Sequence, residues 1–282
     1  MPTLRDTAQR WLVEARRAVL VEVSEARGSV PREAGTRMLV DAHSVEGTIG
    51  GGHLEWKAIA SARERLAKGG NLNGSEHFPL GPALGQCCGG AVTLVYTALD
   101  AAALHRWPVA APRFNLQLYG AGHVGRAIVK ALAPFNVRID WIDEREEEFA
   151  AAQRDAPLHP VAQVSTLCVD AIEAEVRHAP AGAFYLVLTH QHELDLRITE
   201  AVLRRADFAY LGLIGSKTKR QRFMHRFEQR GVAPDALLRL TCPIGVPGIA
   251  GKEPEVLAAA VVAQLLQVSS PGAGAARNLS SG

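Results

Sequence analysis

A strand, a glycine-rich turn and a helix follow one another near the middle of the chain, and this succession restricts the fold more than any other feature. The apolar run 116–119 leads into the sequence GAGHVG at residues 120–125, and an amphipathic run continues to residue 132. In such a motif Gly120 permits the tight turn, Gly122 lets the backbone approach a pyrophosphate, and Gly125 lets the helix pack closely on its strand. The motif predicts a turn that binds the phosphate of a nucleotide or of another phosphate ester.

The acid that accompanies this turn in nucleotide-binding domains is also present. Asp143 ends the next predicted strand, where a carboxylate would bind a ribose hydroxyl. Taken alone, the turn and the acid indicate an oxidoreductase that uses NAD(P). The alternative is that the glycines only allow the strand to enter the helix. The sequence offers no convincing pair of residues for general acid–base catalysis beside the motif.

The predicted elements divide the chain into two domains. Beyond residue 113, strands and helices alternate as far as residue 266, which is typical of parallel βαβ units with a ligand at the carboxyl ends of the strands. Before residue 108, strands are predicted over 18–23, 36–40, 45–49 and 91–97, helices over 4–16 and 54–67, and an irregular stretch over 71–86. Pro108 and Pro112 place the boundary, because proline continues neither kind of element easily.

We therefore expect an α/β protein with a C-terminal Rossmann-like parallel-sheet domain over residues 113–268. A smaller N-terminal α+β domain covers residues 1–108, and residues 269–282 form a disordered tail. The formal net charge of +2 gives no general attraction to nucleic acid or to an anionic membrane. Because no apolar stretch approaches membrane-spanning length, we predict a cytoplasmic protein.

Polar residues follow two further predicted strands of the C-terminal domain. Ser216 would cap the helix that begins at Lys217, so that backbone N–H groups and basic side chains face a phosphate. A solvated basic helix is the alternative. His190 and His192, with Asp195 nearby, would bind a metal or transfer protons, unless they only form a helix-capping loop.

Glycine-rich loops also occur at predicted strand ends of the N-terminal domain. One holds Gly50, Gly51 and Gly52, and another holds Cys87 and Cys88 before two further glycines. The four cysteines of the chain lack the spacing of a structural zinc site and the density of a disulfide scaffold. A thiolate on a flexible loop is accessible to a soft metal or to a sulfur-transfer partner. The alternative is a small buried residue beside a turn.

An ordered set of these motifs resembles the XdhC/CoxI family, whose members are accessory proteins of xanthine dehydrogenase and related molybdenum hydroxylases. The set comprises Gly28-Ser29-Val30-Pro31-Arg32, the sequence GTIGGGHLE at residues 47–55, Cys88-Gly89-Gly90, the turn at 120–125, Thr189-His190 and Ile214-Gly215-Ser216-Lys217. Together the motifs extend over roughly residues 18–266 and are far more specific than any one of them.

The resemblance implies a maturation chaperone rather than an enzyme. Such proteins bind the molybdenum cofactor, protect it while a cysteine desulfurase exchanges an oxo ligand for sulfur, and deliver it to the apo-enzyme. The expected partners are the molybdenum subunit of apo-xanthine dehydrogenase and a cysteine desulfurase, and a homodimer is expected. The expected cofactor-binding residues are Gly50, Gly51, Gly52, Cys88, Gly120, Gly122, His123, Gly125, Asp143, His190, Ser216 and Lys217.

Molybdopterin is a phosphorylated pterin with a dithiolene-bound metal, so Cys88, with Cys87 as the alternative, is expected to approach molybdenum or the transferred sulfur while the glycine turns hold the polar end. Two other functions stay open: an NAD(P)-dependent oxidoreductase, and an adaptor that binds both partner proteins but no cofactor. For subunit pairing, the last predicted helix is expected to expose an apolar face. Its residues are Val256, Ala260, Val261 and Leu265.

Overall fold

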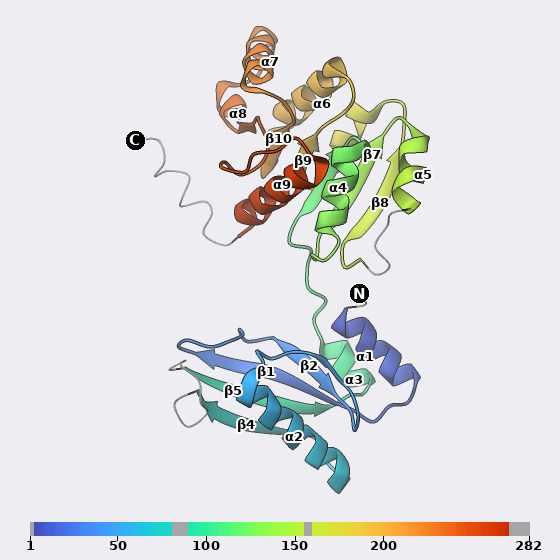
Figure 1. Cartoon of the computed structure of the whole chain (residues 1–282), viewed down its shortest axis with the longest axis vertical. Coiled ribbons are helices and arrows are strands. Elements are labelled where there is room, and N and C mark those ends of the chain that lie inside the picture. The colour runs from blue at the N-terminus through green and yellow to red at the C-terminus, as the bar shows by residue number, and fades with distance from the viewer. Residues whose placement is uncertain (1–2, 81–89, 155–159, 271–282) are drawn as a thin grey trace. The chain divides into compact units, whose positions relative to one another are not determined.

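The computed structural model describes residues 3–80, 90–154 and 160–270 of the 282-residue chain. They divide into two compact units, one over residues 2–109 and the other from residue 110 onward (Figure 1). Each unit has its own sheet and its own hydrophobic core, so each is described by itself. The prediction of a Rossmann-like domain beside an α+β domain is confirmed.

The N-terminal domain is built on a five-stranded antiparallel sheet with the strand order β3-β2-β1-β5-β4. The strands are β1 (Val19–Arg27), β2 (Arg37–Val40), β3 (Val45–Gly47), β4 (Gly74–Pro79) and β5 (Ala91–Ala98). Along β1 the side chains alternate between the two faces. Val19, Val21 and Val23 join the core beneath helix α2 (Gly52–Lys68), whereas Leu20 packs with Trp11 of helix α1 (Leu4–Val13) and with the residues around helix α3 (Ala101–Arg106).

Two elements of this domain differ from the prediction. Strand β4 lies in the stretch predicted to be irregular, and α3 was not predicted. The reason for the first difference is a polar residue on the half-buried side of β4. Glu76 accepts hydrogen bonds from Ser61 and Arg65, at 2.5 and 2.9 Å, and from Tyr96 at 3.3 Å. Because these partners satisfy the carboxylate, the strand needs no apolar alternation.

The C-terminal domain contains a six-stranded parallel sheet with the strand order β11-β10-β9-β6-β7-β8. The strands are β6 (Asn115–Tyr119), β7 (Arg138–Asp143), β8 (Gln163–Cys168), β9 (Phe184–Val187), β10 (Tyr210–Leu213) and β11 (Leu240–Thr241). This is the strand order of a dinucleotide-binding fold, in which successive strands are added on one side of β6 as far as β8 and on its other side from β9 onward. Strand β8 begins later than the weak strand predicted near His159, which lies outside the described residues.

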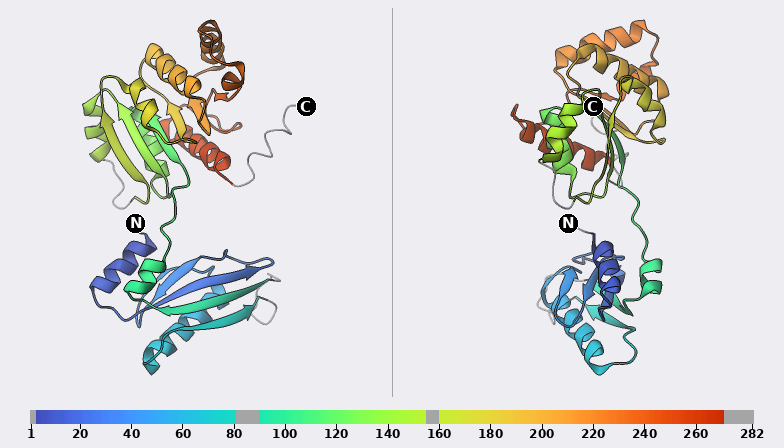
Figure 2. Two further views of the ribbon diagram at one scale, coloured as in Figure 1. Left: turned by 180° about the vertical axis from the view of Figure 1, so that it is seen from behind. Right: turned by 90° about the vertical axis from the view of Figure 1, so that its right-hand side faces the viewer.

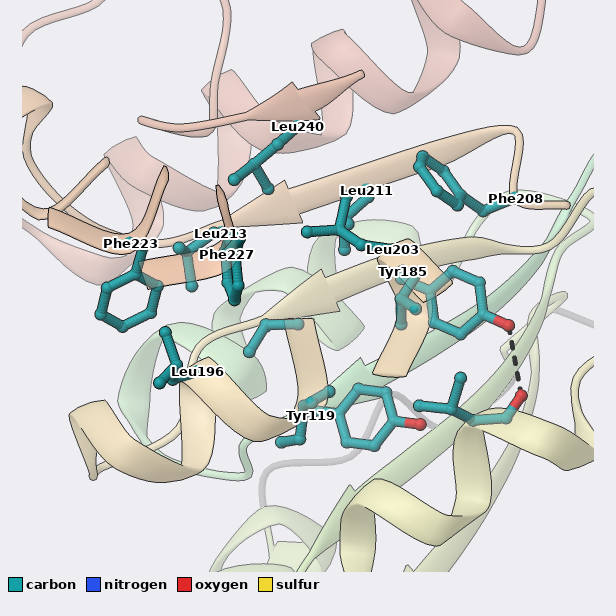
Figure 3. Packing of buried hydrophobic residues seen from close by; sticks show 14 of the residues in the cluster. Tyr119, Tyr185, Leu196, Leu203, Phe208, Leu211, Leu213, Phe223, Phe227 and Leu240 are labelled. Atoms are coloured by element: carbon teal, nitrogen blue, oxygen red, sulfur yellow. Dashed lines mark hydrogen bonds between the residues drawn. The ribbon is translucent and has the colours of Figure 1, made fainter. Parts of the chain in front are cut away.

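Helices cover both faces of this sheet (Figures 1 and 2). The helices on one face are α4 (His123–Leu132), α5 (Glu146–Arg154) and α9 (Pro254–Val268). The other face carries the 3-10 helix η2 (Ile172–His178), α6 (His192–Arg205), α7 (Lys217–Gln229) and α8 (Pro234–Leu238). In Figure 3, Tyr185 of the sheet lies beside Leu203 of α6, and Phe227 of α7 lies beside Leu213 of β10. Helices α5 and α8 were not predicted.

The prediction of an exposed apolar face on the last helix is wrong. Ala260, Val261 and Leu265 are buried, because α9 packs against α4 and the sheet of its own domain. These residues therefore complete the hydrophobic core and offer no free surface to a second subunit. No helix in the described part of the chain is long and apolar enough to cross a membrane.

Candidate functional site

The glycine turn follows β6, the strand next to β9, at the point where the strand order of the parallel sheet reverses. Strands β6 and β9 are neighbours, and the carbonyl oxygen of Leu188, just after β9, lies against Gly120. The loops after β7 and β10 emerge at the same edge, because all four strands run parallel. The structure therefore brings together the predicted turns at residues 120–123, 189–191 and 214–217. In open α/β sheets this edge is where ligands bind.

The three glycines of the turn have different roles. Gly120 has a φ of 120°, and a Cβ atom there would overlap the carbonyl oxygen of Leu188. A Cβ atom on Gly125 would overlap the carbonyl oxygen of Gly120. Gly122, by contrast, has an ordinary φ of −67° and open space where a Cβ would stand. The fold itself requires the first and third glycines, whereas the second leaves room beside the first turn of α4.

Asp143 ends β7 as predicted, but its carboxylate is buried and fully engaged. Oδ2 accepts hydrogen bonds from the N–H of Ala121 at 2.6 Å and from Arg145 at 2.8 Å. Oδ1 accepts from the N–H and from Nε of Arg145, at 3.0 and 2.9 Å. Burial by itself raises the pKa of Asp143, but these hydrogen bonds outweigh it and hold the pKa below its usual range. The carboxylate thus fastens the glycine turn to the loop after β7.

We expect Asp143→Asn to lower the free energy of unfolding at pH 7 by about 2–3 kcal/mol, since charge-assisted hydrogen bonds are lost from a buried site. A carboxylate with a depressed folded-state pKa stabilises the fold above its unfolded pKa of about 3.9, and the effect disappears as the pH falls through the folded pKa. Urea unfolding should therefore show a constant difference between variant and wild type from about pH 8 to pH 5 and a shrinking one below about pH 4. A difference that persists unchanged into strong acid would contradict this assignment.

The two residues predicted to bind a phosphate at the turn after β10, Ser216 and Lys217, have different surroundings. Ser216 is the N-cap of α7, and its hydroxyl accepts a hydrogen bond from the N–H of Lys219 at 3.2 Å. Lys217 is exposed and forms no ion pair within residues 160–270. The helix N-terminus and a free ammonium group are thus available to an anion at this turn.

Lys219, which the sequence analysis missed, forms a buried ion pair between the first turns of α6 and α7. Its Nζ lies 2.5 Å from Oδ2 of Asp195 and donates to the carbonyl of Ile214 at 2.9 Å. The other oxygen of Asp195 accepts from both the N–H and the hydroxyl of Thr189. One signal was present in the sequence: Lys219 stands four residues before Phe223, on the buried face of α7. A lysine on that face requires a buried partner.

The two histidines after β9 do not converge on Asp195. Nε2 of His190 lies 3.4 Å from Oε1 of Glu144, which follows β7, while His192 is exposed at the start of α6. Asp195 is already engaged by Thr189 and Lys219. No group of three or more potential metal ligands occurs among the described residues. The hypothesis that these histidines and Asp195 hold a metal is therefore wrong.

The glycine loop of the N-terminal domain is closed by its own helix. Oε2 of Glu55 accepts hydrogen bonds from the hydroxyl of Thr48 and from the N–H groups of Ile49 and Gly51, at 2.5, 3.0 and 3.1 Å. Gly50 has a φ of 124° and packs so closely on Pro31 that no side chain fits. An external phosphate would have to displace the carboxylate of Glu55 from this loop.

An exposed pair of aromatic rings follows this loop at the start of α2. The rings of His53 and Trp56 are stacked, with their centroids 5.6 Å apart, and Trp56 is 65% exposed. The other tryptophans, Trp11, Trp107 and Trp141, are buried. The pair therefore presents a flat aromatic surface to solvent.

Cys87 and Cys88 lie outside the described residues, so the predicted molybdenum contact at Cys88 stays a prediction. The other two cysteines are free thiols. Desolvation and the carboxylates of nearby Glu146 and Asp143 raise the pKa of the exposed Cys168. Burial raises the pKa of Cys242. Neither therefore has the lowered pKa that marks a reactive thiolate.

A cleft of about 660 Å³ runs beside α4. His123, at the start of α4, and Lys130 line it together with Trp141 and Phe149, whose rings meet edge to face. It extends along the helix rather than over the strand ends, where ligands bind in open α/β sheets.

Comparison with known proteins agrees with this geometry. A family model for the XdhC Rossmann domain matches residues 116–265, and one for the XdhC and CoxI family matches residues 11–78. The chain belongs to the XdhC/CoxI family. The resemblance stated from the ordered motifs is thereby confirmed. The Rossmann match contains the glycine turn, Asp143 and the turn after β10.

Two individual proteins resemble this XdhC/CoxI member over most of its length. The uncharacterized protein YqeB of Escherichia coli (strain K12) is 30% identical over 258 residues, which are 90% of this chain and 44% of that protein. The chain thus spans less than half the length of this relative. A crystal structure described as a xanthine dehydrogenase from Bacillus halodurans has a TM-score of 0.74 at 18% identity and covers 100% of this chain and 98% of its own. At that identity it shows the fold alone.

Proposed function

We propose that this protein is a chaperone of the molybdenum cofactor in the maturation of xanthine dehydrogenase or a related molybdenum hydroxylase. In this role it binds the cofactor, shields it while a cysteine desulfurase replaces an oxo ligand by sulfur, and hands it to the apo-enzyme. Membership of the XdhC/CoxI family supports the role. The similar fold of the Bacillus halodurans protein, itself described as a xanthine dehydrogenase, supports the choice of partner.

The observation that carries the proposal is the room left at Gly122. Nothing in the described part of the chain needs a glycine there, because its φ is ordinary and a Cβ would meet no described atom within 4 Å. An approaching phosphate explains the residue, since the N-terminus of α4 and the free Lys217 both favour an anion at this edge. The phosphate of molybdopterin fits this site.

Taken by itself, the N-terminal domain carries two groups whose chemistry suits a molybdenum pterin. The stacked rings of His53 and Trp56 offer a surface for a planar pterin. Cys88 supplies a soft thiolate of the kind that binds molybdenum or receives sulfur. In this proposal Gly50, Gly51 and Gly52 form the turn before α2, which Glu55 closes, and they do not bind the phosphate. The protein needs no catalytic residue for this role.

We expect the purified protein to retain molybdenum and pterin. Cys88→Ala should lower this retention at least about tenfold, because loss of even an outer-shell partner of a metal costs about that much in affinity. The matched control is Cys168→Ala, which removes another thiol that is exposed. Metal analysis, with pterin fluorescence after oxidation, measures both components in each variant. Equal retention in Cys88→Ala and wild type would eliminate the thiolate contact.

The same purified protein tests the other two functions. Turnover of NAD(P)H with a small substrate would establish an oxidoreductase instead. An adaptor would capture the apo-enzyme and the desulfurase but would retain no pterin when molybdopterin is added. The cofactor measurement therefore separates the three functions with one preparation.

A further inference from the structure

Asp143 has no acceptor position left for a ribose hydroxyl. An ionised carboxylate offers about four lone-pair positions. In this chain all of them are used, by the N–H of Ala121, by the N–H of Arg145 and by two nitrogens of the Arg145 side chain. The acid that would identify a dinucleotide turn in the sequence is thus satisfied from within the protein.

All three nitrogens of the Arg145 guanidinium donate to carboxylates. Nε and one terminal nitrogen bind the two oxygens of Asp143, and the other terminal nitrogen donates to Glu148 at 3.1 Å. Glu148 also accepts from Arg126 at 2.5 Å, and Arg126 in turn donates to the carbonyl of Ala121 within the glycine turn. The group is a closed network of two carboxylates and two guanidinium ions beside the turn.

We infer that Arg145 closes the ribose position of the glycine turn, so that the turn receives a phosphate ester but neither NAD nor NADP. A ribose diol can bind Asp143 only by replacing hydrogen bonds between charged partners with weaker neutral ones. The 2′-phosphate of NADP would need a free guanidinium, yet Arg145 already faces two carboxylates, and Glu147 adds a third negative charge nearby. Arg145 is therefore a specificity-determining residue.

Rejection of NAD and NADP by the glycine turn is a property beyond the proposed function. The closed ribose position explains why the glycine turn and Asp143 are both present in a protein that, in the proposed function, transfers no hydride. It also implies that the rejection can be reversed. Removal of the Arg145 side chain leaves the backbone bonds to Asp143 and returns acceptor positions on both oxygens, which is the arrangement that a dinucleotide-binding turn offers to ribose.

The test is titration of the full chain with NAD and NADP by isothermal calorimetry. Wild type should show no saturable binding at millimolar concentrations of either dinucleotide. Arg145→Ala should bind NAD saturably, with a Kd at least about tenfold below the highest NAD concentration at which wild type shows no saturation, as the release of one charge-assisted hydrogen bond allows. The matched control is Arg138→Ala. Arg138 is an exposed arginine at the first residue of β7, the strand that ends at Asp143, and this variant should behave as wild type.

If Arg145→Ala does not fold, Arg145→Lys serves in its place, because lysine keeps a positive charge beside Asp143 but cannot form the bidentate hydrogen bonds of the guanidinium. Saturable binding of either dinucleotide to wild type would overturn the inference. So would a folded Arg145 variant with no gain in NAD affinity. Cofactor retention is a separate measurement on wild type, so failure of the chaperone function and failure of this inference are distinguishable.

Discussion

Replacement of Gly120 by alanine is expected to destabilise the C-terminal domain by about 3–5 kcal/mol and to lower its melting temperature by roughly 10 °C. Two costs add. The residue has a φ of 120°, in a region where residues with side chains are strained, and the new methyl group would overlap the carbonyl oxygen of Leu188. That carbonyl belongs to the loop after the neighbouring strand β9, so the overlap can be relieved only by separating two packed strands.

The matched variant is Gly122→Ala, which makes the same chemical change two residues further on. Because its φ is −67° and its Cβ would meet open space, we expect the melting temperature to stay within about 2 °C of wild type. The same methyl group occupies the space assigned to the phosphate, so cofactor retention should fall. Scanning calorimetry and metal analysis measure the two effects. Equal losses of stability in both variants would show that Gly122 also serves the fold.

The fold could be predicted from the sequence wherever apolar periodicity and turn chemistry agreed. The alternation of strands and helices beyond residue 113, and the glycines before α4, predicted the parallel sheet and the position of its turn correctly. Strand β4 could not be found in this way, because its half-buried Glu76 is compensated by Arg65 of the preceding helix α2 and by Tyr96 of the following strand β5. Compensation of a polar residue by side chains of other elements leaves no alternation within the strand itself.

In the candidate site, too, the sequence predicted the positions of residues but not the contacts of their side chains. The sequence located Asp143 correctly at the end of the second strand of the Rossmann domain, because strand length and spacing determine that position. Its hydrogen bonds to Arg145 depend on a side-chain conformation that spacing does not specify. Likewise, the glycine loop at Gly51 was correctly identified as a turn, but only the structure shows that Glu55 occupies its N–H groups. Residue types indicate which chemistry is available, whereas side-chain packing decides which groups remain free.

Lys219→Met should destabilise the C-terminal domain by about 3–5 kcal/mol, because it leaves the carboxylate of Asp195 buried without its counter-ion. The side chains of Lys219 and Asp195 are only 12% and 2% exposed, so water cannot replace the lost ammonium group. The pair also joins the loops after β9 and β10, through Thr189 on one side and Ile214 on the other. We therefore expect this edge of the sheet, where the phosphate site is proposed, to become less rigid, with faster amide hydrogen exchange in both loops.

The double variant Lys219→Met/Asp195→Asn separates the cost of an unpaired charge from the cost of lost packing. Asparagine keeps an oxygen that can accept from the N–H of Thr189 but carries no charge. If the unpaired charge causes the loss, urea unfolding should show the double variant to be more stable than Lys219→Met alone, although Asp195→Asn by itself destabilises the wild type. If the two losses simply add, the ion pair contributes no coupling, and the stem of Lys219 against Gly215 and Phe223 accounts for its place on the buried face of α7.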